Sequence, residues 1–293
     1  MMELPPIMEI LDLRELEPGL FESPPIQDGR ARVFGGQLAS QALAAASFTV
    51  QGAPCHSMHG RFLLPGLPGR SIHFEVSTLH DGKRFAARQV LAIQREQPIF
   101  CLTASFQGSP GVIESYQGEM PQVPGPDQVE AEFSAAEKQK RAELMASLPP
   151  HVQADLQVQW PIETRNITAP RWYSAERLVP LRQAWFRSRT ELPEFENLHR
   201  CALTYATDFF PVQTCVMPLG VSIVEPALQL ASLDHNVWFH RPFRADEWLL
   251  YSGTCDTVAD GRGLARGQVF SAEGQLVATV VQEGLVHQLD GEA

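Results

Sequence analysis

The segment 35–47 carries the strongest helix pattern in the chain. It begins with Gly35-Gly36 and continues almost entirely in Ala, Leu, Gln and Ser, with no charged residue on any face. A helix that is apolar nearly all round is buried, and its many Ala side chains let a neighbouring layer come close. The pattern therefore predicts a helix enclosed by a curved sheet rather than a helix lying on a surface.

Strand patterns follow in quick succession. Residues 72–77 alternate apolar and polar side chains, Asp81-Gly82 is a hairpin turn signal, and 85–93 pairs with 99–106 around Glu96-Gln97-Pro98. No helical pattern of about 10 to 15 residues separates these strands. We predict an antiparallel meander, which argues against a parallel sheet with a nucleotide-binding crevice at its strand ends.

The pattern breaks between 108 and 152. Gly, Pro and Gln dominate 108–127, and 128–148 is a charged, Ala-containing stretch that ends at Pro149-Pro150. We interpret 108–152 as a linker carrying one solvated helix, between an N-terminal unit at 1–107 and a C-terminal unit at 153–293. A partner-binding helix is the alternative, but evenly mixed charges are more typical of a solvated face.

The second half of the chain repeats the first. Phe62-x-x-Pro65 recurs as Phe239-x-x-Pro242, an offset of 177 residues, and Asp81-Gly82-Lys83 recurs as Asp260-Gly261-Arg262, an offset of 179. The copies therefore differ by an insertion of two residues between these strands. This repeat predicts an α+β architecture made of two copies of one helix-plus-meander unit, packed as a pseudo-dimer.

Composition narrows the class of protein. The chain has 293 residues, 44% of them hydrophobic, and its 23 basic against 34 acidic residues give a net charge of −11. Such a surface does not suit the phosphate backbone of nucleic acid. Five cysteines without a C-x-x-C spacing favour a reducing compartment, and no apolar run is long enough for a membrane span of about 20 residues. We expect a soluble cytoplasmic protein with no stable membrane insertion and no nucleic-acid partner.

Several motifs were considered and excluded. The G-x-S-x-G pentapeptide of α/β hydrolases is absent. The pairs His56/His59 and His235/His240 resemble fragments of a metal site, but they fall in predicted strands, where such spacings do not form a ligand set. Gly261-x-Gly263 lies in a hairpin, with the wrong spacing for a dinucleotide fingerprint. The sequence therefore implies neither a metal nor a cofactor.

The remaining motifs lie in both halves of the chain, and they are Arg32-Val33-Phe34-Gly35-Gly36-Gln37, His56-Ser57-x-His59, Phe62-Leu63-x-Pro65-Gly66, Pro98-Ile99-Phe100, Thr103-Ala104-Ser105-Phe106-Gln107, Leu233-Asp234-His235-x-x-Trp238-Phe239-His240-Arg241-Pro242-Phe243 and Val281-Gln282-Glu283-Gly284. Together they resemble the acyl-CoA thioesterase II family over most of the chain outside the linker. The resemblance implies a double hot dog, in which an antiparallel sheet wraps a long helix twice in one chain. It also implies hydrolysis of fatty acyl-CoA to free acid and coenzyme A.

The resemblance further implies three residues that activate water. They are Asp208 near the end of the second central helix, Gln282, and a Thr position at which this chain has Ser232. Ser keeps the hydroxyl as donor and acceptor but lacks the methyl group that restricts the rotamer. In this scheme the carboxylate accepts a proton from water, the other two side chains orient the water, and backbone N–H groups stabilise the oxyanion.

The repeat adds an expectation of its own. An offset of 177 places Ser105 at the position of Gln282, so the first half lacks the matching amide. We predict one working site per chain, built mainly from second-half residues. The first half would supply the facing wall, with His56, His59, Gly35 and Gly36 as candidate substrate-binding residues.

Two function hypotheses remain at this stage. The first is an acyl-CoA thioesterase, and the alternative is a non-catalytic acyl-thioester binding module on the same fold. A hydratase is disfavoured because the stretch 205–210 offers no His. The coenzyme's phosphates would need Arg side chains, and the sequence does not choose among Arg30, Arg61, Arg70, Arg241, Arg244, Arg262 and Arg266. Exposed sheet edges favour a homo-oligomer.

Overall fold

The computed structural model describes residues 4–27, 29–108, 114–129, 158–167, 176–225 and 227–288, with scattered positions between 139 and 153. The helices are α1 (Ile7–Ile10), α2 (Gly35–Phe48), α3 (Pro126–Val129), α6 (Glu196–Thr207), α7 (Pro211–Val216) and a 3-10 turn at Met217–Leu219. The strands of the first half are β1 (Arg14–Glu17), β2 (Leu20–Glu22), β3 (Cys55–Phe62), β4 (His73–Asp81), β5 (Phe85–Gln94) and β6 (Gln97–Gln107). Those of the second half are β7 (Ile162–Asn166), β8 (Leu181–Ser188), β9 (Leu228–Ser232), β10 (Asp234–Phe239), β11 (Leu249–Ala259), β12 (Arg262–Ser271) and β13 (Leu276–Gln288).

The described strands form one antiparallel sheet, in which the strands of the second half follow those of the first half in mirrored order. The order is β1-β2-β4-β5-β6-β3-β10-β13-β12-β11-β8-β7, with β9 added to β13. The two halves meet where β3 pairs with β10, and His59 lies opposite Asn236 in that pair. Because the repeat offset of 177 relates these same two residues, a pseudo-twofold axis passes between them. The predicted α+β pseudo-dimer of helix-plus-meander units is confirmed.

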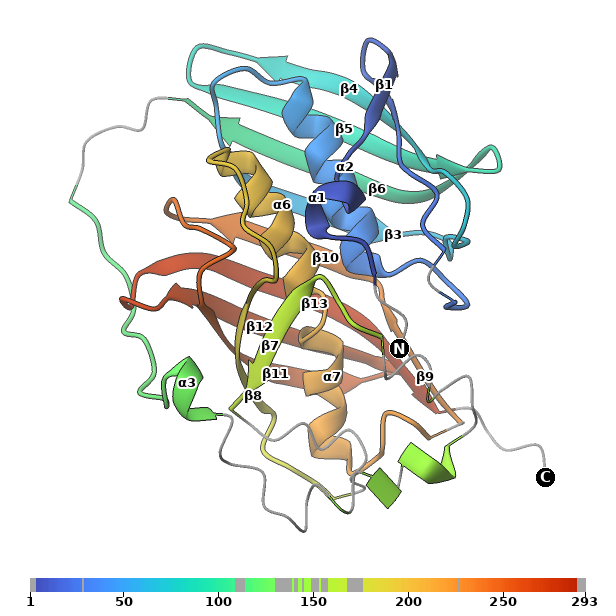
Figure 1. Cartoon of the computed structure of the whole chain (residues 1–293), viewed down its shortest axis with the longest axis vertical. Helices are drawn as coiled ribbons and strands as arrows, with labels where there is room; N and C mark the ends of the chain where they lie inside the picture. The colour runs from blue at the N-terminus through green and yellow to red at the C-terminus, as the bar shows by residue number, and fades with distance from the viewer. Residues whose placement is uncertain are drawn as a thin grey trace.

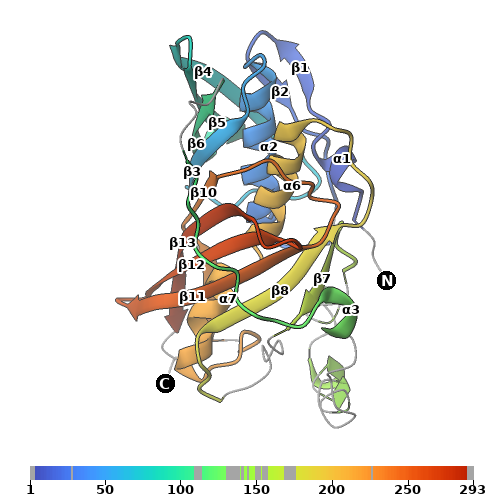
Figure 2. The same ribbon diagram turned by 90° about the vertical axis from the view of Figure 1, so that its left-hand side faces the viewer.

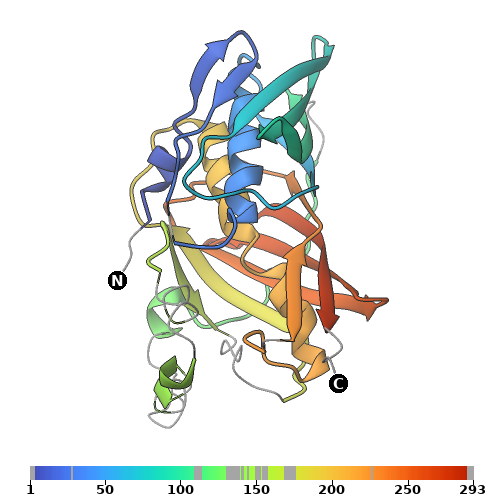
Figure 3. The ribbon, with the colours of Figure 1, turned by 90° about the vertical axis from the view of Figure 1, so that its right-hand side faces the viewer.

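Helices α2 and α6 lie side by side on one face of this sheet (Figure 1). They run antiparallel, because Gly36 in the first turn of α2 meets Tyr205 in the last turn of α6. A Cβ atom at Gly36 would lie 2.4 Å from the carbonyl oxygen of Tyr205, so only glycine permits this approach. The predicted helix at 35–47 is confirmed, and its flanks are buried by α6 and by the sheet that curves around both helices (Figures 2 and 3).

The second helix is interrupted rather than continuous. Pro211 is the first residue of α7, and proline has no N–H to continue the α6 ladder. Helix α7 packs on β11, β12 and β13, where Gly284 makes room: a Cβ atom there would lie 2.6 Å from Val212. The break therefore leaves a short connection, residues 208–210, between two well-packed helices.

Two hairpin turns differ from the sequence-based prediction. The β5–β6 turn is formed by Arg95 and Glu96, both with positive φ, one or two residues before the predicted position. Asp260-Gly261 forms the expected two-residue turn with positive φ at both positions. In the first half, Asp81 belongs to β4 and pairs with Ala86 of β5. The β4–β5 turn is therefore longer than the β11–β12 turn at Asp260-Gly261.

The first part of the linker packs against the sheet. The Trp185 indole donates to the Pro124 carbonyl at 2.8 Å, and Val129 is buried against Trp185, Leu250 and Phe270. These side chains lie on the face of the sheet that is opposite α6. The linker crosses that face of the sheet in Figure 2. The solvated helix predicted at 128–148 falls largely outside the described residues, so the division into 1–107, 108–152 and 153–293 stays a prediction.

None of the helices in the described part of the chain is long and apolar enough to cross a membrane.

Gly60 lies in β3, close to the centre of the pseudo-dimer, and a substitution there tests how tightly this region is packed. A Cβ atom there would lie 2.4 Å from the Phe100 ring, which is fully buried. We expect Gly60→Ala to lower the free energy of unfolding by about 1–3 kcal/mol through overpacking, as measured by urea denaturation. Gly118→Ala is the control, since nothing lies within 4 Å of a Cβ atom there. Equal stability of the two variants would contradict this account.

Candidate active site

Asp208 lies in the connection between α6 and α7. It is the C-cap residue of α6, directly after Thr207, and is only 8% exposed. A carboxylate so buried needs hydrogen-bond donors or a positive environment. Both are present around it, and they approach its two oxygens from different sides.

Two side chains from the sheet donate to one oxygen of Asp208. The Ser232 hydroxyl, at the end of β9, donates to Oδ1 at 3.0 Å, and the Gln282 amide, on β13, donates to the same oxygen at 2.5 Å. Ser232 lies opposite Gly284 in the β9–β13 pair, two residues along β13 from Gln282. The three residues implied by the family resemblance are therefore brought together, and the Ser hydroxyl reaches the carboxylate without the methyl group of Thr.

The other oxygen of Asp208 faces the N-terminus of α2. A Cβ atom at Gly35 would lie 2.7 Å from Oδ2, so glycine is required for this approach. Among the hydrogen bonds between described residues, none uses the N–H of Gly35 or Gly36. The first N–H groups of a helix carry its positive dipole end and favour negative charge nearby. Oδ2 thus lies at a site suited to anions.

Asp208, Ser232 and Gly35 line a cavity of about 680 Å³. Its walls combine apolar side chains with two arginines, Arg30 and Arg32. The remaining described residues that line it are Ala31, Val33, Phe34, Leu38, Phe62, Leu63, Leu64, Pro65, Gly66, Trp160, Phe209, Val212, Gln213, Ile223, Leu230, Ala231 and Leu233. Asp208 is the only carboxylate among these described lining residues, and Gln282 lies behind it, 1% exposed.

The two arginines are held by neighbouring groups. The Arg30 guanidinium lies 4.7 Å from the Trp160 ring centre, and Arg32 donates to the Leu230 carbonyl at 2.9 Å. Phe34 packs edge-on against Trp160 and stacks on Phe209, which gives the cavity an aromatic wall. Despite the net charge of −11, this cavity therefore has a mouth with excess positive charge.

His235, on β10, is a fully buried residue behind the carboxylate. Its Nε2 lies 3.1 Å from the Thr207 hydroxyl, and its Nδ1 has no hydrogen-bond partner among the described atoms. Burial lowers the pKa of His235, while the charges of Asp208 and Asp234 oppose the shift. The imidazole is therefore neutral near pH 7.

The structure does not bring His56 and His59 to this cavity. His56 contacts Ser105 at 2.8 Å, and His59 is exposed with its ring against Trp238. Met58, between them, faces α6, so His59 points to the opposite face of the sheet. The register of β3 also shifts between Cys55 and Ser57, which the sequence pattern did not indicate. Of the expected facing wall, Gly35 lines the cavity, and Gly36 lies beside it against Tyr205.

The counterpart positions in the first half lack this chemistry. Asp208 is the thirteenth position from the start of α6, and Ser47 is the thirteenth of α2. The Ser47 hydroxyl donates to the Leu43 carbonyl, and Ser105, the counterpart of Gln282, contacts His56. Neither a carboxylate nor an amide stands at these two positions, in agreement with one such site per chain.

A palindromic sheet around two antiparallel helices, with one polar cluster at their junction, defines a double hot dog protein. A hot dog protein of unknown function from Alicyclobacillus acidocaldarius superimposes with a TM-score of 0.73 at 16% identity, over 97% of this chain and 98% of that one. The structure of the acyl-CoA thioesterase II TesB2 from Mycobacterium marinum gives a TM-score of 0.76 at 34% identity, over 97% and 99%.

Sequence comparison leads to the same class. Family models for acyl-CoA thioesterase and for its N-terminal domain match residues 152–285 and 23–107. Acyl-CoA thioesterase 2 of Haemophilus influenzae is 34% identical over 96% of both chains. Human acyl-coenzyme A thioesterase 8 is 30% identical over 96% of this chain and 88% of its own. The chain belongs to the acyl-CoA thioesterase II family.

Sequence reasoning missed His235 as a neighbour of the site and could not single out Arg30 and Arg32. A signal existed for the arginines, since both lie within five residues of Gly35, where the chain enters α2. No local pattern could have revealed His235, because its neighbour Thr207 is 28 residues away along the chain.

The buried imidazole predicts a pH dependence of stability. Because the folded pKa of His235 lies below its usual value of about 6.5, the unfolded chain binds more protons as the pH falls below that value. Stability is therefore lost with falling pH, by up to about 1.4 kcal/mol per pH unit from this group. His235→Gln should flatten the dependence between about pH 7.5 and 5.5 in urea titrations. An unchanged slope in His235→Gln would contradict the assignment.

Proposed function

We propose that this chain hydrolyses fatty acyl-CoA thioesters to free fatty acid and coenzyme A, with water as the nucleophile. The observation that carries the proposal is the arrangement of Asp208. Its Oδ1 accepts from Ser232 and Gln282, and its Oδ2 remains toward the N-terminus of α2. One oxygen is thus fixed, and the other is left to accept a proton.

Asp208 acts as the general base in this mechanism. A water molecule gives a proton to Oδ2 while its oxygen attacks the thioester carbonyl carbon. The tetrahedral intermediate carries a negative oxygen, which the N–H groups at Gly35 and Gly36 stabilise by about 3 kcal/mol per donor. Collapse of the intermediate expels the thiolate, whose pKa near 8.5 makes it a good leaving group. The protonated Asp208 then returns its proton to the sulfur or to solvent.

Ser232 and Gln282 position the base. Two donors on a single oxygen fix the orientation of the carboxylate, which spares the reorganisation that a free side chain would need. Gln282 is buried behind the carboxylate and does not line the cavity, so it acts on the attacking water through Asp208. In the sequence-based scheme both residues orient the water instead.

The coenzyme binds at the arginine side of the cavity. Arg30 and Arg32 supply positive charge for phosphate groups, which a guanidinium recognises with two parallel hydrogen bonds. The apolar and aromatic wall, with Phe34, Trp160 and Phe209, takes the acyl group. Binding a polyanion on a chain of net charge −11 thus depends on two local cations.

The non-catalytic binding module has no observation in its favour. The substitution of Thr by Ser kept that alternative open, yet the Ser232 hydroxyl donates to Asp208 at 3.0 Å. The polar cluster therefore remains complete for hydrolysis.

A cytoplasmic location and a homo-oligomer complete the proposal. All five cysteines are free, which suits a reducing compartment. Among the described strands, β1 and β7 stand at the ends of the sheet and each pairs on one side only, and such edges favour association between copies.

Substitutions at the carboxylate and the amide test the mechanism. We expect Asp208→Asn to lower kcat by about 10² to 10⁴, because the general base is lost, and Gln282→Ala to lower it by at least about tenfold. Ser232→Thr should keep activity. The assay is release of the coenzyme A thiol, detected with a thiol reagent, from acyl-CoAs of graded chain length. Full turnover by Gln282→Ala would refute its role, and binding of acyl-CoA without thiol release by the unmodified protein would favour the binding module.

A substrate without phosphates tests the arginines. We expect Arg30→Ala and Arg32→Ala to raise KM for acyl-CoA by about tenfold each, roughly 1.4 kcal/mol of binding. KM for the N-acetylcysteamine thioester of the same acid should hardly change, because it lacks the phosphate groups. Arg84→Ala, at the exposed β4–β5 turn, is the control. Equal effects on both substrates would show that the arginines act on the fold of the site instead.

A further inference from the structure

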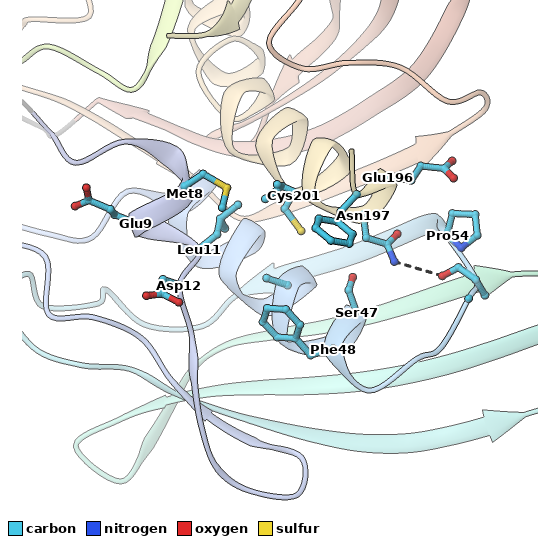
Figure 4. A pocket seen from close by; sticks show the side chains of 15 residues that line it. Met8, Glu9, Leu11, Asp12, Ser47, Phe48, Pro54, Glu196, Asn197 and Cys201 are labelled. Carbon is cyan, nitrogen blue, oxygen red and sulfur yellow. Dashed lines mark hydrogen bonds between the residues drawn. The ribbon is translucent and has the colours of Figure 1, made fainter. Parts of the chain in front are cut away.

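A second pocket lies at the opposite end of the helix pair from Asp208. It has a volume of about 840 Å³ and is formed where α1 crosses the end of α2 and the start of α6 (Figure 4). Buried Leu11, Ala44 and Cys201 are among its lining residues, and exposed Met8 and Phe48 stand at its rim. The remaining described residues around it are Glu9, Asp12, Ser47, Gly52, Ala53, Pro54, Phe195, Glu196, Asn197 and Leu198.

This pocket is the pseudo-twofold counterpart of the site at Asp208. The first cavity joins the start of α2 to the end of α6, and the second joins the start of α6 to the end of α2. Ser47, the counterpart of Asp208, lines it with its hydroxyl bonded to Leu43. Asn197, which matches Gly36 by helix position, bonds to the backbone of Ala53 and Cys55. The cavity persists, but the position that corresponds to Asp208 carries a hydroxyl instead of a carboxylate.

The charges of the two pockets are opposite. Arg30 and Arg32 line the first, whereas none of the described residues that line the second is basic. Glu9 and Asp12 are exposed at its rim, and no ion pair between described residues involves either of them. The phosphates of coenzyme A and the carboxylate of a free fatty acid are therefore repelled here.

We propose that this pocket binds a single-chain amphiphile with a cationic head group. The chain lies in the apolar space that reaches Ala44 and Cys201, and the head group lies beside Glu9 and Asp12. Its lining includes the almost fully buried Leu11, Ala44 and Cys201, which a flexible chain reaches more readily than a peptide helix. Its volume is that of a small-molecule site, which spans about 300 to 1,000 Å³. The site is separate from that of thioester hydrolysis and does not depend on it.

Three ligands of equal chain length distinguish the contribution of the head group to the binding affinity from that of the alkyl chain. Binding of dodecylamine, dodecanol and dodecanoate, each below its aggregation concentration, is measured by titration calorimetry at low and high salt. We expect the amine to bind at least about tenfold more tightly than the carboxylate, with the difference shrinking in high salt as charge attraction is screened. Equal affinities for the three would overturn the proposal.

Two variants locate the binding. Ser47→Phe fills the pocket and should abolish amine binding, while thioester hydrolysis at the other end of the helices continues. The double variant Glu9→Gln/Asp12→Asn changes only exposed side chains, so it should fold normally, lose about tenfold in amine affinity and keep dodecanol affinity. Arg84→Ala is the matched control.

Four outcomes would refute the pocket assignment. In the first two, the amine binds to Ser47→Phe or to the double variant as tightly as to the unmodified protein. In the third, the amine inhibits hydrolysis by competing with acyl-CoA. In the fourth, the protein binds a basic amphipathic peptide but does not bind the amine. Since the measurement is binding, an absence of hydrolytic activity would refute only the proposed function.

Discussion

The close contact between the start of α2 and the end of α6 is the constraint on which the site depends. Gly36 admits the Tyr205 carbonyl, and Gly35 admits the Asp208 carboxylate. A methyl group at either position would separate the helices or displace the acid. This contact joins the two halves across the sequence, because one helix supplies the N–H groups and the other supplies the carboxylate. Neither half of the chain could build the site alone.

The sheet fixes the remaining geometry of the site. Gln282 and Ser232 reach Asp208 because β9 and β13 are neighbours and because Gly284 lets α7 settle on β13. The carboxylate is thus held between a helix dipole on one side and two neutral donors on the other. The fold itself therefore orients the donors around the carboxylate.

Sequence reasoning recovered the repeat and the buried helix because both are expressed in local patterns. The trio around Asp208 came from family resemblance, since its members are 24 and 74 residues apart along the chain. His56 and His59 do not line the cavity, because the face that a strand residue occupies depends on register and on the shift at Cys55/Ser57, so their role in substrate binding stays a prediction. The packing of 114–129 on the sheet was missed for a related reason: its partners, such as Trp185 and Gly274, lie far away in sequence.

The His59–Asn236 pair at the pseudo-twofold axis shows what covalent fusion of the halves permits. In a dimer of identical subunits, the residue on the axis must face its own copy, and every substitution is imposed on both clefts at once. Here the two positions hold different residues, so each half is free to diverge. One cleft holds an acid and two cations, while the other holds Ser47 in place of the acid and carries negative charge at its rim. Joining the two halves in one chain thereby allows two clefts of the same architecture to carry different side chains and opposite charge.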